Sequence, residues 1–261
     1  TLAGSKQGLL NLISLLQDKH NLLINYPHWS RSIKIPFKRF KVRLKKKLLP
    51  LEGTFNLLEK RGKLVAPSEW NALISNNKTL VLDVRNEYET KIGYFSGSTN
   101  PLTKNFTDFT NFVETKLQDY KSENIAMYCT GGIRCEIASS YLLQSGFKNV
   151  FQLKGGILNY LKSIKQEEQL WKGECFVFDE RVSVDQELEE GNFVQCFGCR
   201  RPLSEEDLES KKYAKGVSCP YCFDLSSNSD KKRFAQRQKQ IDLAEAKGHK
   251  HLGQSARQLR K

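Results

Sequence analysis

Apolar residues recur along the chain with two different periods, and each period predicts one kind of segment. Between residues 5 and 19, leucine and isoleucine return every three or four positions, which predicts an amphipathic helix. Residues 38–46 alternate instead, so that Phe40, Val42 and Leu44 fall on one face and cations on the other. A strand with this period of two buries its apolar face and exposes its charged face.

From residue 66 onward, short apolar runs alternate with helical patterns. Strands are expected at 80–85, 125–129 and 150–153, and helices from Pro67, at 106–117, at 135–144 and at 157–165. Pro67 leads into its helix and Ser68 is the expected N-cap. The alternation predicts an α/β fold in which helices cover a parallel sheet. In such sheets the chemistry lies at the carboxyl ends of the strands.

The strand expected at 125–129 runs into the segment Cys129, Thr130, Gly131, Gly132, Ile133, Arg134. A thiol in front of glycines and a helix start lies over backbone N–H groups, which stabilise a thiolate. We therefore predict an enzyme in which Cys129 is the nucleophile and Arg134 stabilises a bound anion, with Thr130 to Ile133 as the active-site loop. The alternatives are a buried structural cysteine and an arginine paired with Glu136 at the helix start.

Three further features lie near this loop. Asp83 and Arg85 end a neighbouring strand, where Asp83 is expected to organise the loop or form a structural ion pair and Arg85 to line the pocket. Cys135 can resolve an oxidised Cys129 as a disulfide, but the six-residue separation is expected to hold the thiols apart, which favours a packing role. The Gly-Gly pair at 155–156 is expected to permit close backbone packing.

Four cysteines form a second constellation, Cys196-x2-Cys199 and Cys219-x2-Cys222, with nineteen residues between the pairs. This spacing predicts a closed tetrahedral site with four thiolates, for which zinc is the expected metal. Disulfides and free thiols are the alternatives. A site with four sulfur ligands has no open position, so we expect no catalysis from it. No flavin, haem or nucleotide motif is visible.

The net charge of +13 is unevenly distributed. Residues 1–65 carry 14 Lys and Arg against 3 Asp and Glu, residues 66–225 carry 18 against 23, and residues 226–261 carry 10 against 3. Two basic ends favour nucleic acid as a partner. The expected strand at 38–46 contributes Arg39, Lys41, Arg43 and Lys45 as candidate RNA-binding residues, with an edge strand guarded by lysines as the alternative.

No apolar run approaches the roughly 20 residues of a membrane span, so no membrane association is expected. Seven cysteines without a visible secretory signal indicate reduced thiols and a cytoplasmic location. The first residue is Thr1 rather than Met, which indicates a fragment.

The residues at Asp83, Arg85, Cys129–Arg134 and Gly155–Gly156 resemble a rhodanese domain, in which a cysteine at the strand–helix turn carries a persulfide. The phrases CTGGIRCE (129–136), GGILNY (155–160) and GECFVFDERV (173–182) are similar to the rhodanese-containing tRNA uridine-34 hydroxylases. The resemblance implies a partial acylphosphatase-like, ferredoxin-like basic domain and linker at 1–65, a rhodanese domain at 66–170, and a four-cysteine region with a basic tail at 171–261.

The resemblance also implies a reaction, which is the oxygen-dependent conversion of uridine to 5-hydroxyuridine at the wobble position of tRNA. Molecular oxygen is then the co-substrate, tRNA is the partner and Cys129 is the essential cysteine. Either the thiolate adds to C6 of the uracil ring, or a persulfide relays electrons to an oxidant. The other functions considered are a persulfide-forming sulfurtransferase that uses no RNA and a non-catalytic binding module. No protein partner is indicated.

Overall fold

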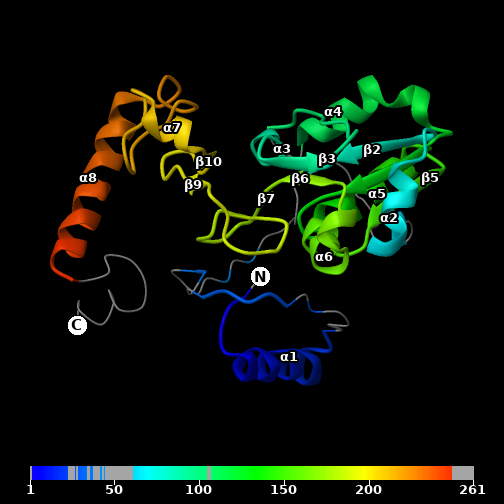
Figure 1. Ribbon diagram of the computed structural model, residues 1–261, viewed down its shortest axis with the longest axis horizontal. Helices are drawn as coiled ribbons and strands as arrows, with labels where there is room; N and C mark the ends of the chain where they lie inside the picture. Colours follow the sequence, from blue (N-terminus) through cyan, green and yellow to red (C-terminus); the bar gives the residue numbers. More distant parts are fainter. Residues whose placement is uncertain are drawn as a thin grey trace.

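The structure is a computed structural model that describes residues 2–22, 27, 29–33, 36–37, 42, 44, 61–104 and 107–248 (Figure 1). Its first helix, α1 (Lys6–His20), lies where the helical pattern predicts it. The helix begins after Ser5, whose side chain accepts a hydrogen bond from the Gly8 amide at 3.2 Å. No residue of α1 is buried. Its apolar side is therefore not covered by any element that the structure describes.

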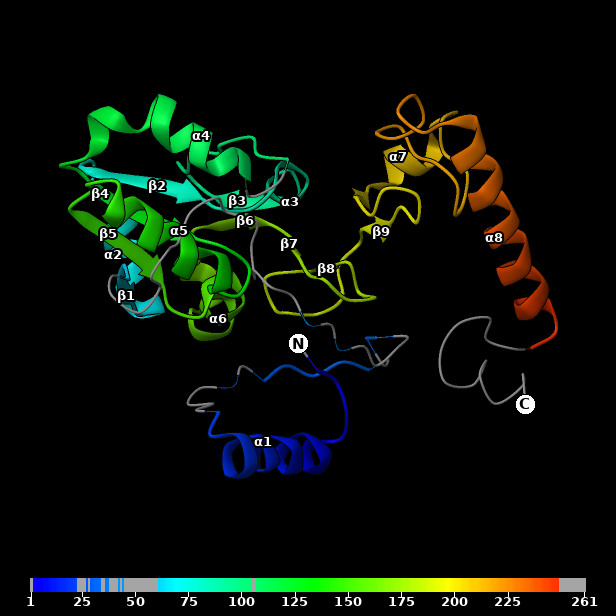
Figure 2. The same ribbon diagram turned by 180° about the vertical axis from the view of Figure 1, so that it is seen from behind.

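A four-stranded parallel sheet forms the centre of the α/β domain (Figure 2). The strands, in the spatial order β1-β5-β4-β2, are β1 (Lys63–Val65), β5 (Asn149–Leu153), β4 (Asn124–Tyr128) and β2 (Thr79–Asp83). The helices around the sheet are α2 (Pro67–Ile74), α3 (Glu87–Thr90), α4 (Thr107–Lys116), α5 (Ile133–Gln144) and α6 (Gly156–Ser163), with 3-10 turns η1 (Gln118–Tyr120) and η2 (Gln166–Glu168). The predicted parallel sheet with flanking helices is confirmed.

The sheet is buried on both faces, as a parallel sheet requires. In β4, Ile125 and Met127 point to one face, where side chains of α4 and α5 pack. Ala126 and Tyr128 point to the other face, where α2 and α6 pack together with Trp171. Figure 1 shows α4 above the sheet and α6 below it. Because side chains alternate along a strand, the residue that follows Tyr128 returns to the face of α4 and α5.

The start of α2 corrects one prediction. Ser68 was expected to be the N-cap, but the helix begins at Pro67, so that Ala66 occupies the cap position. Proline suits the first helical position because its missing N–H would have no partner there, and its fixed backbone angle is already helical. The Glu69 carboxylate accepts the Ala66 amide at 3.4 Å and so supplies the cap from inside the helix.

Several small elements follow the sheet in the chain. Two-stranded antiparallel pairs are formed by β3 (Gly93–Phe95) with β6 (Trp171–Gly173), β7 (Cys175–Phe176) with β8 (Ser183–Val184), and β9 (Val194–Gln195) with β10 (Pro202–Leu203). The last helices are α7 (Glu205–Glu209) and α8 (Asn228–Ala246). In Figure 1, β9, β10, α7 and α8 form a separate group beside the sheet domain. Within the described parts of the chain, no helix is long and apolar enough to cross a bilayer.

The predicted strand at 38–46 falls mainly on residues outside the described ranges. Val42 and Leu44, the two members that are described, are exposed, so the predicted burial of these side chains is wrong. The physical reason is that neither belongs to a strand of the described sheets and no described element covers them. The ferredoxin-like segment and the three domain boundaries remain predictions.

A completely buried ion pair closes the carboxyl end of β2. Arg85 donates from Nε and Nη2 to the Asp83 carboxylate at 2.9 and 2.6 Å. Its remaining donors reach two carbonyl oxygens, that of Glu89 at 3.2 Å and that of Gly93 at 2.6 Å. The guanidinium carbon also lies 5.0 Å from the centre of the Trp171 ring. Arg85 thus ties the end of β2 to α3 and β3, and it leaves no charge unpaired in this part of the interior.

We expect Asp83→Ala to lower the free energy of unfolding by about 3–5 kcal/mol, because it leaves the Arg85 charge buried without its partner. Urea denaturation of the full chain measures this loss. The control is Asp224→Ala, which removes an exposed carboxylate paired with Lys212 at 2.6 Å. That change should stay within about 1 kcal/mol. Equal effects of the two substitutions would contradict the role given to the buried pair.

Candidate active site

Cys129 follows β4 directly and points to the sheet face that α5 covers. Gly132, with φ of 88°, then turns the chain into α5, which begins at Ile133, two residues before the predicted start. The backbone amides of Arg134 and Cys135 consequently form hydrogen bonds to the Cys129 sulfur. The residue is only 1% exposed. The predicted cradle of amides at a helix N-terminus is therefore present, and the sulfur lies beneath the loop rather than on the surface.

This environment stabilises the thiolate of Cys129. A hydrogen bond from the Cys135 thiol is the largest cause, and together with the Arg134 charge and the helix amides it outweighs burial and lowers the pKa of Cys129 to about 6. At pH 7 the thiolate therefore outnumbers the thiol by roughly ten to one. Burial and the neighbouring Cys129 raise the pKa of Cys135, which stays protonated as the donor.

The expectation that the loop separates the two thiols is wrong. Because α5 begins at Ile133, Cys135 is its third residue, and its thiol is a hydrogen-bonding partner of the Cys129 sulfur. Both cysteines are free and buried. Cys135 is therefore a hydrogen-bonding neighbour of the candidate nucleophile and does more than fill space in the core.

Arg134 is held by a buried carboxylate. Its Nη1 and Nη2 donate to the two oxygens of Glu89 at 2.6 and 2.8 Å, and Nη2 also donates to the Thr130 hydroxyl at 3.3 Å. Glu136, the expected alternative partner, instead lies 3.8 Å from Arg61. The Arg134 side chain is 15% exposed, so its charge faces both the Cys129 sulfur and the edge of the site.

Glu89 belongs to the site, although the predictions from the sequence did not include it. It is completely buried on α3, and besides the two Arg134 bonds it accepts the Asn86 amide at 3.2 Å. The available signal was the spacing of Asn86 and Glu89, which is that of an N-cap and the third helical residue. That signal places a carboxylate at a helix start but does not indicate that it faces an arginine 45 positions later in the chain.

The segment 174–182, part of the phrase GECFVFDERV, runs past the outer side of the loop. The Thr130 hydroxyl donates to the Phe176 carbonyl at 3.4 Å. The Phe178 ring lies 5.6 Å from the guanidinium carbon of Arg134 and is 62% exposed. Ile133, at the start of α5, is 63% exposed. Two exposed apolar side chains and an arginine therefore lie on the outer side of the loop, and no local pattern in the sequence marks Phe178 as one of them.

The second Gly-Gly turn packs against the loop, as predicted. Gly156 has φ of +67°, and a Cβ atom there would lie 2.7 Å from the Gly132 nitrogen and from the Thr130 oxygen. The Ile157 amide donates to the Cys129 carbonyl at 3.0 Å. The start of α6 therefore fixes the backbone of the loop from the side opposite α3.

Asp83 and Arg85 support the site without lining it. Arg85 is fully buried, so the prediction that it lines a pocket is wrong, because its donors are all directed inward to Asp83 and to backbone carbonyls. The hydrogen bond from Arg85 to the Glu89 carbonyl fixes the backbone of Glu89, and the Glu89 carboxylate in turn holds Arg134. A cavity of about 220 Å³ lies instead between α3 and the C-terminal group, with Tyr88, Lys91, Arg201 and Tyr221 among its lining residues.

The remaining predicted residues fall into two sets. Cys196, Cys199, Cys219 and Cys222 come together, with sulfur atoms within 4.8 Å of one another. The four candidate RNA-binding residues, Arg39, Lys41, Arg43 and Lys45, lie outside the described residues.

Cys175 lies fully buried in β7, where burial raises its pKa to about 12. It is therefore a neutral core thiol at pH 7.

Comparisons with known proteins agree with this geometry. Residues 66–163 match the family described as "Rhodanese-like domain". A protein named tRNA uridine(34) hydroxylase from Mesorhizobium japonicum (strain LMG 29417 / CECT 9101 / MAFF 303099) is 45% identical over 256 residues, which is 97% of this chain and 82% of that protein. The chain belongs to the tRNA uridine(34) hydroxylase family.

Among solved structures, this family member is similar to a rhodanese-like domain from an Anabaena species and to one from Staphylococcus aureus. The first is 20% identical and covers 42% of this chain and 78% of its own, with a TM-score of 0.35. The second is 23% identical and covers 38% of this chain and 90% of its own, with a TM-score of 0.31.

The protonation state of Cys129 gives the first test of the site. The ultraviolet thiolate absorbance of the wild type minus that of Cys129→Ser should titrate with a midpoint at about pH 6. Cys135→Ala removes the strongest donor and should move the midpoint upward, whereas Cys135→Ser keeps an O–H donor and should restore most of the shift. A midpoint near that of an ordinary cysteine in the wild type would contradict the thiolate assignment.

Removal of Glu89 gives the second test. Glu89→Ala leaves the Arg134 guanidinium largely buried without its partner, so it should lower the free energy of unfolding by about 3 kcal/mol. It should also raise the Cys129 midpoint, because Arg134 is no longer held toward the sulfur. Glu136→Ala, on the more exposed ion pair with Arg61, is the matched control and should change stability by less than about 1 kcal/mol. An unchanged midpoint in Glu89→Ala would show that Glu89 has no positioning role.

Proposed function

We propose that this protein hydroxylates uridine 34 of tRNA to 5-hydroxyuridine, with Cys129 as the reacting group. One atom of the co-substrate molecular oxygen enters the base, and a two-electron reductant carries the other atom to water. The observation that carries the proposal is the 45% identity, over 97% of the chain, to the relative named tRNA uridine(34) hydroxylase. A sulfurtransferase without an RNA substrate would need the same rhodanese loop. The identity extends over 97% of the chain and so includes parts outside the rhodanese-like residues 66–163, and this extent favours the hydroxylase.

The loop supplies the chemical group that such a reaction needs. Cys129 is ionised near neutral pH, and a thiolate is the nucleophilic form of cysteine. Arg134 contributes a fixed positive charge beside it. A charge held in place before the substrate arrives stabilises a developing negative charge without reorganisation. We therefore assign Cys129 as the catalytic residue, Arg134 as the stabiliser of the anion, and Glu89 as the positioning residue for Arg134.

The surroundings of the loop suit an unpaired base. Proteins read single-stranded RNA by stacking splayed bases on aromatic side chains and arginine planes. Phe178 and Arg134 offer both kinds of surface next to each other, and Ile133 adds an apolar edge. The wobble base lies in a single-stranded loop of tRNA, so it can be turned outward without breaking a base pair.

The burial of the sulfur bears on the two routes considered for Cys129. Direct addition to C6 of uracil needs the ring at about 3–3.5 Å from the sulfur, and the residue is 1% exposed. A persulfide carries its outer sulfur about 2 Å further along the bond. The persulfide forms when the Cys129 thiolate takes the sulfane sulfur of a donor such as thiosulfate, which leaves as sulfite. Its outer sulfur then reaches the base with less displacement of the loop, and we favour this route. A cytoplasmic location follows from a tRNA substrate.

The experiment that tests the proposal is nucleoside mass spectrometry of tRNA from cells that lack the gene, complemented with variants of the full chain. Wild type should restore 5-hydroxyuridine at position 34, and Cys129→Ser should leave it at background. Cys175→Ala is the matched control, because it removes a buried neutral thiol of the core. It should restore the modification.

Two results would count against the proposal. Normal modification in cells that carry only Cys129→Ser would show that Cys129 is not the catalytic residue. Sulfur transfer from thiosulfate to cyanide that depends on Cys129, together with no effect of the gene on position 34 and no salt-sensitive binding of tRNA, would support the sulfurtransferase instead.

A further inference from the structure

The four clustered cysteines lie in the C-terminal group of elements, far along the chain from the rhodanese loop. Cys196 and Cys199 bracket the turn after β9, and Cys219 and Cys222 bracket a second turn before α8. The Cys196 and Cys222 sulfurs are 3.9 Å apart, those of Cys199 and Cys219 are 3.7 Å apart, and those of Cys219 and Cys222 are 3.7 Å apart. All four sulfur atoms lie within 4.8 Å of one another.

The three separations of 3.7–3.9 Å are those of a tetrahedral metal site. Four sulfurs at about 2.3 Å from a central zinc ion lie about 3.8 Å from one another. A disulfide would bring two sulfurs to about 2.05 Å, which excludes disulfides as the cause of the clustering. Packing alone does not favour four clustered thiols, because apolar side chains would fill the same space better.

Backbone amides point at the sulfurs in the manner of metal-binding knuckles. The amides of Gly198 and Cys199 form hydrogen bonds to the Cys196 sulfur, and the Arg201 amide forms one to Cys199. In the second knuckle the Tyr221 amide forms one to Cys219. Outer donors of this kind orient metal ligands and stabilise their negative charge.

The hydrophobic core of this group is too small to explain its fold. Among the described residues of the group, Leu203 is the one aliphatic side chain in the core that is fully buried. The other buried members of the cluster are Cys196, Cys219 and Cys222, and Cys199 packs against them. Modules with so little apolar burial depend on a disulfide or a metal for stability, and these cysteines are free. The need of this group for a metal therefore agrees with the separations of its four sulfur atoms.

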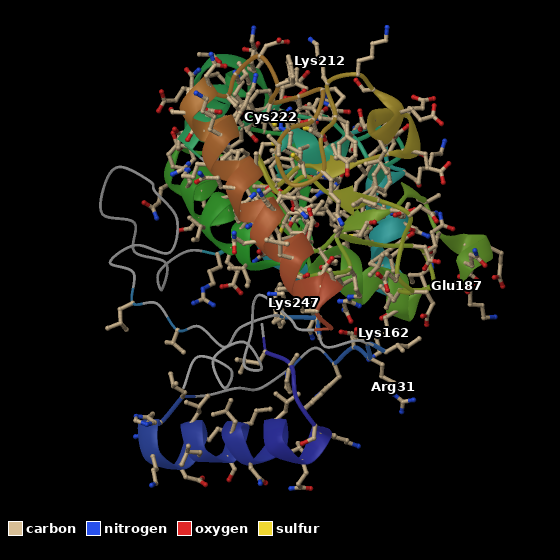
Figure 3. The ribbon with its side chains drawn as sticks, turned by 90° about the vertical axis from the view of Figure 1, so that its left-hand side faces the viewer. Arg31, Lys162, Glu187, Lys212, Cys222 and Lys247 are labelled. Atoms are coloured by element: carbon tan, nitrogen blue, oxygen red, sulfur yellow. The ribbon has the colours of Figure 1, made fainter. Side chains whose placement is uncertain are left out.

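The helix α8 is attached to both knuckles by one arginine. Nη2 of Arg237 donates to the Phe197 carbonyl at 3.0 Å and to the Gly216 carbonyl at 2.8 Å. Phe197 lies inside the first knuckle and Gly216 lies just before the second. Gln238, the one buried residue of α8, occupies the space that a side chain at position 216 would need. Figure 3 shows Cys222 near one end of α8 and Lys247 at the other.

We propose that Cys196, Cys199, Cys219 and Cys222 bind one Zn²⁺ ion in a closed structural centre, and that this centre holds α8 in place through Arg237. Zinc with four thiolates carries a net charge of −2, and Arg237 is a cation attached to both knuckles. Loss of the metal would separate the knuckles and release the carbonyl acceptors of Arg237. It would also displace Arg201 and Tyr221, which line the cavity next to α3.

The primary test uses the wild-type full chain, purified without chelators or a metal-affinity tag. Elemental analysis should find about one zinc per chain, as expected for a four-thiolate site. A mercurial that titrates the thiols should release this zinc to a colorimetric indicator. Limited trypsin digestion should then cut α8 at least tenfold faster than it does in the untreated protein.

Variants separate the metal from the attachment of the helix. Cys199→Ser should lose most of the zinc, whereas Cys129→Ser, in the rhodanese loop, should keep it. Arg237→Gln should keep zinc but speed tryptic cleavage within α8, and Lys239→Gln, an exposed cation of the same helix, should change neither. These readouts do not use hydroxylation, so the zinc centre and the proposed function can fail separately.

Three results would overturn this inference. The first is wild-type protein without metal whose α8 resists trypsin. The second is a mass that shows two disulfides among the four cysteines. The third is iron in place of zinc, which would remove the assignment of the metal.

Discussion

The site depends on keeping a negative sulfur stable inside the protein. Cys129 lies beneath its loop, where burial alone would favour the neutral thiol. The Cys135 S–H, two helix amides and the Arg134 charge reverse this preference. Each of these groups must be held at the sulfur before any substrate arrives, since a misplaced donor leaves the charge uncompensated. The surrounding fold can be understood as the structure that holds them.

The supporting contacts form one continuous chain through the interior. Asp83 pairs with Arg85, Arg85 binds the Glu89 carbonyl, the Glu89 carboxylate holds Arg134, and Arg134 acts on Cys129. Every charge in this chain has a partner, which is the condition under which burial of ions is tolerated. The arrangement links the carboxyl ends of β2 and β4 and thereby ties the geometry of the candidate site to the stability of the sheet.

The four-cysteine group applies the same physical principle to a structural task. Its sulfurs are also surrounded by backbone amides, and an arginine, Arg237, is attached to the turns that carry them. The difference lies in access to the ligands. Four thiolates around one ion would leave no open position, whereas Cys129 belongs to no group of metal ligands among the described residues and lies under a loop that carries Arg134 and exposed Ile133, with Phe178 against Arg134. One set of sulfurs is suited to hold the fold and the other to react.

Periodicity and spacing within short segments were enough to predict the parallel sheet, the strand–turn–helix at Cys129 and the pairing of the two Cys-x2-Cys knuckles. Contacts between distant segments set the partner of Arg134, the inward orientation of Arg85 and the position of Phe178 beside the loop. These contacts join residues up to 45 positions apart, and no local pattern records them. The packing of α5 against the end of β4 also brings the Cys135 thiol to the Cys129 sulfur, with Cys135 as the third residue of a helix that begins two residues before its predicted start.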